Sequence, residues 1–169
     1  MNAHRDTLLD WLRDAHAMEE QAETMLSAMA KRIENYPDLR TRIEAHLEET
    51  QRHAHLLRGC LERLGGETSV VKDVMGKFVA IGQGFSGIFV ADEIIKGSMA
   101  SYTFEHMEIV AYKVLISAAE SADDGETRAV CQSILREEEA MAAWLAENIG
   151  PLTQKFLMRE EAPELTAKH

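Results

Sequence analysis

Apolar residues recur along this chain at spacings of three and four, the period that is typical of amphipathic helices. Glycine, proline and clustered polar residues interrupt the pattern at only a few places. The interruptions leave four long helical segments, which we expect at residues 6–34, 37–64, 92–122 and 126–150. No alternation with a period of two is long enough to predict a strand. The hydrophobic pattern therefore predicts an all-α fold.

The connections between these segments indicate how the helices are arranged. Residues 35–37 and 123–125 are short breaks, so the helices on either side of each break are expected to form a hairpin. The longer connection, residues 67–91, is a crossover that we expect to carry a short helix near 70–81. Two helical hairpins joined by a long crossover form a ferritin-like up-down four-helix bundle.

Gly150-Pro151 is a strong stop signal, because glycine favours helix ends and proline lacks the backbone N–H that a helix interior needs. We expect the fourth helix to end there. The chain is accordingly predicted to comprise a bundle domain over residues 1–150 and a C-terminal tail over 151–169, made of a short helix and a fraying end.

Each predicted helix carries an acidic residue in the middle of its apolar stripe. Burying an ionised carboxylate costs several kcal/mol unless a neighbouring group neutralises it. The stripes contain no lysine or arginine, so a metal ion is the simplest neutralising group. Glu19 and Glu49 are 30 residues apart, as are Glu108 and Glu138, which predicts two hairpins related by a pseudo-twofold axis. Glu105 lies one turn before Glu108 on the same stripe.

Histidines in the second segment add nitrogen donors. His46, Glu49 and His53 are separated by three and four residues and project from one helix face. His53 follows Glu49 by one turn and is the candidate nitrogen ligand. A single buried histidine such as His46 is more often a hydrogen-bonded core residue than a ligand.

These acidic segments contain four motifs: Asp14-Ala-His-Ala-Met-Glu-Glu-Gln21, His46-Leu-Glu-Glu-Thr50, Glu105-His-Met-Glu-Ile109 and Leu135-Arg-Glu-Glu-Glu139. The motifs resemble those of the YciE/YciF-type proteins, a branch of the ferritin-like superfamily associated with bacterial stress. The resemblance covers residues 6–148. It implies a ferritin-like fold and a metal centre built from carboxylates.

The resemblance also implies a set of ligands for that centre. Glu19, Glu49, Glu108 and Glu138 would bind the metal, and Glu105 would be an extra carboxylate, similar to the pattern of the peroxide-reducing rubrerythrins. The expected cofactor is a di-iron centre, with manganese as the other candidate metal.

The sequence departs from the Glu-x-x-His pattern of ferritin-like sites in two helices. Arg52 stands where the second segment would carry the histidine, so His53 or His46 has to take that role. The fourth segment has Met141 and Ala142 at the corresponding place and offers no histidine. The residues therefore leave two alternatives: a full two-metal site, or a site in which one metal is weakly bound or absent.

Two functions of different classes follow from these residues. The first is a metal-binding protein that handles iron or peroxide under stress, and if it is an enzyme it is a di-iron oxidoreductase of the ferroxidase or peroxidase type. The alternative is a non-catalytic helical module that binds a partner and has lost the metal. A weaker third reading is an apolar small-molecule site near residues 82–89.

Charge and composition indicate which binding partners and which compartment to expect for the protein. The net charge of −11 and the absence of a compact basic block argue against nucleic-acid binding. The longest uncharged stretch, residues 78–91, is short for a membrane span, and two cysteines are too few for a disulfide framework. We therefore expect a cytoplasmic protein. The apolar residues expected on its surface predict a homodimer; they are Phe78, Phe85, Phe89 and Phe156.

Overall fold

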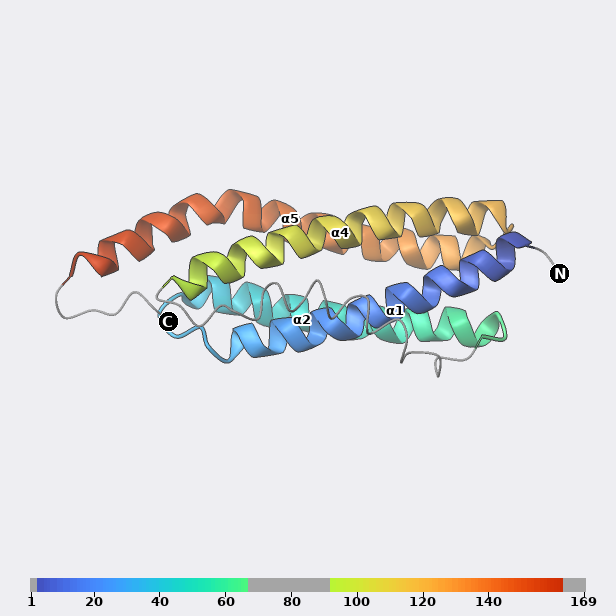
Figure 1. Cartoon of the computed structure of the whole chain (residues 1–169), viewed down its shortest axis with the longest axis horizontal. Coiled ribbons are helices and arrows are strands. Elements are labelled where there is room, and N and C mark those ends of the chain that lie inside the picture. Colours follow the sequence, from blue (N-terminus) through green and yellow to red (C-terminus); the bar gives the residue numbers. More distant parts are fainter. Residues whose placement is uncertain (1–2, 67–91, 163–169) are drawn as a thin grey trace.

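The computed structural model describes residues 3–66 and 92–162, which form four helices and no strand. The helices are α1 (Ala3–Ala30), α2 (Pro37–Arg63), α4 (Glu93–Ser121) and α5 (Gly125–Glu160) (Figure 1). None of the helices in these two ranges has the length and apolar character that crossing a membrane requires. The short helix expected near 70–81 and the glycine-aromatic segment at 82–89 lie outside the described residues.

The helices pair as two antiparallel hairpins, α1 with α2 and α4 with α5, and the hairpins pack against each other (Figure 1). α1 contacts α4, and α2 contacts α5. α2 ends and α4 begins at opposite ends of the bundle, so these two helices run in the same direction (Figure 1). The all-α, up-down four-helix bundle predicted from the hydrophobic pattern is confirmed.

Local chemistry explains where most of the helices begin and end. Pro37 occupies the first turn of α2, where its missing N–H costs nothing. Gly65, just after α2, has a positive φ of 73° that glycine adopts without strain. Asp124 caps α5 by accepting a hydrogen bond from the backbone N–H of Thr127, and Arg63 at the end of α2 pairs with the same carboxylate at 2.6 Å.

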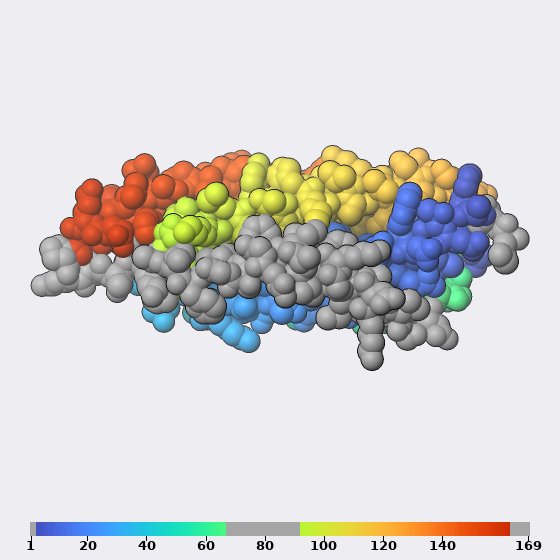
Figure 2. Space-filling model, in the orientation of Figure 1, coloured from blue at the N-terminus to red at the C-terminus, as the bar shows by residue number. Residues whose placement is uncertain are grey.

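The predicted helix end at Gly150-Pro151 is wrong, because α5 continues through Pro151 to Glu160. Proline removes one backbone hydrogen bond from the helix and favours a bend, and α5 curves along its length (Figure 1). Packing compensates for this loss: Leu152 and Phe156, beyond the proline, are both buried. Phe156 is therefore not the exposed residue that the sequence suggested. The space-filling view shows this part of α5, in red, extending past the start of α4 (Figure 2).

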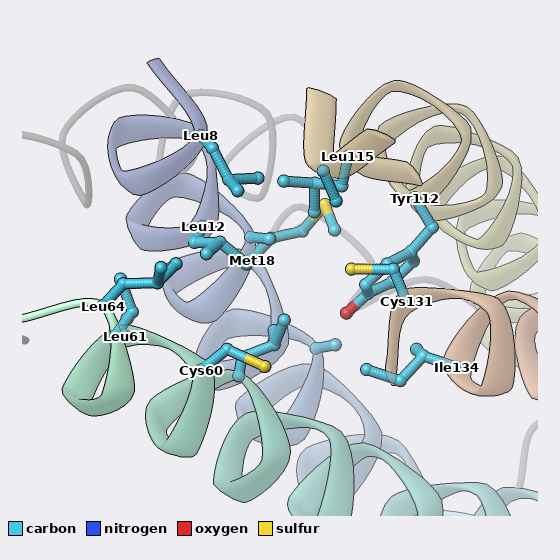
Figure 3. Packing of buried hydrophobic residues seen from close by; sticks show 14 of the residues in the cluster. Leu8, Leu12, Met18, Cys60, Leu61, Leu64, Tyr112, Leu115, Cys131 and Ile134 are labelled. Atoms are coloured by element: carbon cyan, nitrogen blue, oxygen red, sulfur yellow. The ribbon is translucent and has the colours of Figure 1, made fainter. Parts of the chain in front are cut away.

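Two apolar clusters fill the bundle and leave a polar zone between them. The first cluster lies towards the start of α1 and the end of α2, and includes Leu12, Leu61 and Leu115 (Figure 3). The second lies at the opposite end and includes Ile43 and Leu145. Each helix therefore passes from one apolar cluster to the other through a central polar turn, and these turns carry the candidate site.

Candidate metal centre

Six acidic and histidine side chains meet in this central zone, and every helix contributes at least one. Their common feature is nearly complete burial, with exposed fractions of 0–1%. They are Glu19 from α1, His46 and His53 from α2, Glu105 and Glu108 from α4, and Glu138 from α5. The apolar residues above and below exclude water from them, so their charges act in a medium of low dielectric constant.

Four of these side chains form a first group: His46, Glu105, Glu108 and Glu138. Each offers one ligand atom, and the four atoms lie within 4.8 Å of one another. His46 Nε2 is 3.2 Å from a Glu105 oxygen and 3.3 Å from Glu138 Oε2. The group thus combines three carboxylates with one imidazole nitrogen, a donor set that suits iron or manganese.

The second group contains Glu19, His53 and Glu138. His53 Nδ1 lies 2.9 Å from Glu138 Oε1 and 3.5 Å from Glu19 Oε2. The hydroxyl of Tyr112 donates a hydrogen bond to the other oxygen of Glu19 and fixes that carboxylate. Glu138 belongs to both groups, because its two oxygens face different histidines. The two groups could therefore each hold a cation, with Glu138 as their common residue.

The polar atoms that face the centre fit a cation better than they fit one another. Among the described residues, ten buried side-chain nitrogen and oxygen atoms have no hydrogen-bond partner, and seven of them belong to the two groups. They include His46 Nε2, His53 Nδ1 and both oxygens of Glu138. A buried polar atom without a partner costs about 1–3 kcal/mol, so native proteins keep few of them. Their convergence on one small volume forms a site that could hold a metal ion.

The electrostatics of the two histidines reflect the surrounding acids. Burial acts to lower the pKa of His46, but the carboxylates of Glu105, Glu138 and Glu49 outweigh it and raise this pKa to about 12. Burial likewise opposes protonation of His53, and its acidic neighbours, Glu138 first, raise its pKa to about 10. A cation that binds here has to displace these protons.

The carboxylates divide according to their neighbours. Burial raises the pKa of Glu105 to about 8, even though His46 opposes this shift. Burial and the negative charges of nearby carboxylates hold the pKa of Glu108 well above its ordinary value. Glu138 is the exception, because contacts with His46 and His53 overcome its burial and lower its pKa to about 2. Glu138 is thus the carboxylate that stays ionised, and it is the one that both groups share.

Two further glutamates touch the histidines from outside the groups. Glu49 Oε2 is 2.8 Å from His46 Nδ1, and Glu137 Oε2 is 2.6 Å from His53 Nε2. Each of these carboxylates also pairs with an arginine, Arg42 for Glu49 and Arg52 for Glu137. They lie at the edge of the bundle rather than in its centre.

Five of the six side chains that the sequence suggested as ligands lie in the two groups; these are Glu19, His53, Glu105, Glu108 and Glu138. Glu49 is not brought into either group. His46, one turn earlier on α2, takes the inward position, and Glu49 turns towards Arg42 with 25% of its side chain exposed. His46 itself was the weaker candidate, although its place on the apolar stripe was a usable signal.

Comparison with known proteins shows a family and a solved structure that are similar to this chain. The chain matches the family described as a domain of unknown function, DUF892, over residues 3–158. A solved protein of Xanthomonas campestris pv. campestris is 41% identical, with a TM-score of 0.82; the match covers 95% of this chain and all of that one.

Two more distant structures share the architecture. The stress protein YciF of E. coli is 20% identical with a TM-score of 0.80, over 92% of this chain and 99% of that one. Ferritin-like, diiron-carboxylate proteins of Bacillus anthracis are 17% identical with a TM-score of 0.72, over 88% and 99% of the two chains. The resemblance noted in the sequence is confirmed.

Proposed function

The chain belongs to the DUF892 family, and from that premise we propose that it binds iron in a non-haem di-iron or iron–manganese carboxylate centre and handles iron or peroxide in the stress response. The observation that supports this most directly is the convergence of unpartnered buried donor atoms on two groups that share Glu138. The diiron-carboxylate and stress descriptions of the two distant structures point the same way.

Each of the two groups of residues would bind one cation. His46, Glu105, Glu108 and Glu138 would hold one cation, and Glu19, His53 and Glu138 the other. Bound iron would supply ferroxidase chemistry, in which O₂ or peroxide oxidises Fe²⁺, or peroxidase chemistry, in which peroxide is reduced.

The chain's own contribution is a buried, charged zone between two apolar clusters. Glu105 and Glu108 can release protons as positive charge arrives, because the pKa values of both are raised. Tyr112 holds the Glu19 carboxylate in place through its hydroxyl.

Metal analysis of protein expressed in iron-rich medium tests the proposal. We expect the unmodified chain to retain iron, Glu19→Ala to lose the cation of the second group, and Glu138→Ala to lose both. Glu139→Ala is the matched control, since Glu139 is exposed on the same helix and pairs with Lys113. No metal above trace in the unmodified chain would overturn the proposal and leave the non-catalytic module as the better description.

We further propose a homodimer in a cytoplasmic setting. Trp11, Val110 and Val114 form an apolar face between α1 and α4, with 41%, 61% and 43% of each residue exposed. A twofold dimer would cover this face in both copies. The two cysteines, Cys60 and Cys131, are free thiols, which suits a reducing compartment. Light scattering of the unmodified chain and of Val110→Lys tests the dimer; a monomeric unmodified chain would refute it.

A further inference from the structure

Each of the two histidines of the centre contacts a carboxylate outside the two groups. In each ring one nitrogen faces the buried groups and the other meets a carboxylate outside them. His46 Nδ1 lies 2.8 Å from Glu49 Oε2, and His53 Nε2 lies 2.6 Å from Glu137 Oε2. The nitrogen that points outward is therefore Nδ1 in one ring and Nε2 in the other.

Both outer carboxylates are themselves anchored. The oxygen of Glu49 that meets His46 is 3.2 Å from Arg42 Nη1, and the oxygen of Glu137 that meets His53 is 2.7 Å from Arg52 Nη2. An arginine thus compensates the charge of each carboxylate, which stays available as an acceptor. The two contacts have different origins, because Glu49 comes from α2 itself and Glu137 from α5.

We propose that Glu49 and Glu137 are positioning residues that select the metal-binding nitrogen of each ring: Nε2 in His46 and Nδ1 in His53. The inference rests on the proposed function, since it concerns how the same centre is held. A neutral imidazole carries a single N–H, and a carboxylate that accepts it leaves the lone pair of the opposite nitrogen free for a metal.

The inner nitrogens are placed as this requires. His46 Nε2 lies 3.2 Å from a Glu105 oxygen and 3.3 Å from a Glu138 oxygen, and it has no hydrogen-bond partner. His53 Nδ1 is likewise without a partner and lies 2.9 Å from Glu138. The two rings therefore present different nitrogens to one shared carboxylate, an asymmetry that sequence spacing alone does not contain.

The ligating nitrogen can be read directly from the Zn²⁺-loaded chain, because Zn²⁺ is diamagnetic and binds the same donors. In two-bond ¹H–¹⁵N spectra of chain labelled at histidine, we expect a retained N–H at Nδ1 of His46 and at Nε2 of His53. The other nitrogen of each ring should show the shift of a metal-bound atom. Both rings bound through the same nitrogen would overturn the inference.

Calorimetric titration with Zn²⁺ then tests the two glutamates. Glu49→Ala and Glu137→Ala should each weaken binding by about 10–100-fold, the usual cost of removing such an outer contact. Glu49→Gln and Glu137→Gln should recover most of the affinity, because the amide oxygen still accepts the ring N–H. Glutamine variants as weak as the alanine variants would overturn positioning in favour of a pure charge effect.

Matched controls distinguish a failure of this inference from a failure of the proposed metal centre. Glu48→Ala and Glu139→Ala remove the neighbouring exposed glutamates and should bind Zn²⁺ like the unmodified chain. An unmodified chain that does not bind Zn²⁺ overturns the metal centre, and the inference with it. Normal Zn²⁺ binding by both Glu49→Ala and Glu137→Ala overturns the inference alone. The spectra of the unmodified chain decide the question even if a variant fails to fold.

Discussion

Glu138→Leu is the most informative single change, because this carboxylate serves both groups. Leucine fills a similar volume, so the substitution removes the charge and the two acceptor oxygens without opening a large cavity. In the structure Glu138 lies 3.3 Å from His46 Nε2 and 2.9 Å from His53 Nδ1. Both histidines therefore lose a partner at once.

The size of the effect can be worked out for metal-free protein. Removing one partner of a buried ion pair costs about 3–5 kcal/mol, since the other charge is left uncompensated. We expect the lower end, about 3 kcal/mol, because His46 keeps Glu105 and His53 keeps Glu19 as acidic neighbours. For a chain of this length 1 kcal/mol shifts the melting temperature by about 2–4 °C, so the drop should be roughly 6–12 °C.

Calorimetry in the presence of a chelator, repeated after loading with iron, measures both consequences. The metal-free variant should melt lower than the unmodified chain, and loading should no longer raise its melting temperature. Glu139→Leu is the control, and as an exposed change it should stay within about 0.5 kcal/mol of the unmodified chain. An unchanged or higher melting temperature in metal-free Glu138→Leu would refute the reasoning, because it would mean that the imidazole contacts contribute nothing.

Three further outcomes follow from the structure. Tyr112→Phe removes the donor to the buried Glu19 carboxylate and should cost about 1–3 kcal/mol in a denaturant titration; no loss would contradict the role of that hydrogen bond. Asp124→Ala removes the cap of α5 and should cost about 1 kcal/mol while leaving metal content unchanged, so lost metal would show that the helix end affects the centre. The raised pKa values of Glu105 (about 8) and His53 (about 10) mean that the folded chain binds more protons than the unfolded one, so metal-free stability should fall from pH 5 to pH 10. Metal affinity should rise over that range as the protons become easier to displace, and parallel pH trends in melting and binding would contradict the assignment.

Most helix boundaries were predictable because they depend on neighbouring residues in the chain. Pro37, Gly65 and Asp124 each end or begin a helix through their own backbone or side-chain chemistry. Pro151 misled the prediction because its effect is decided by tertiary packing. The burial of Leu152 and Phe156 against the end of the bundle keeps α5 helical beyond the proline.

The central position of the acids was also predictable, since helical periodicity defines which face of a helix is buried. It does not define which of two polar residues on that face turns inward. His46 and Glu49 share a face of α2, but it is His46 that turns inward and Glu49 that turns outward. The acids of α4 and α5 already supply negative charge opposite His46, and an imidazole is better placed there than a further carboxylate. The contact of Glu137 with His53 joins two helices, so no spacing within a single helix could have indicated it.

Buried acids alone do not require a metal in this bundle, because protons can also neutralise them. The pKa of Glu105, raised to about 8, keeps that carboxyl largely protonated near neutral pH, and the pKa of Glu108 is also raised well above its ordinary value. The ionised Glu138 faces two imidazolium rings. Protons cancel the charge and give close ion-pair contacts of 2.9–3.3 Å, but the inward-facing atoms in these contacts still lack hydrogen-bond geometry. A cation satisfies those atoms together, at about 1–3 kcal/mol for each one otherwise left unpaired. The unpaired atoms, rather than the buried charge, therefore carry the argument for a metal, and the protons that it displaces make its binding depend on pH.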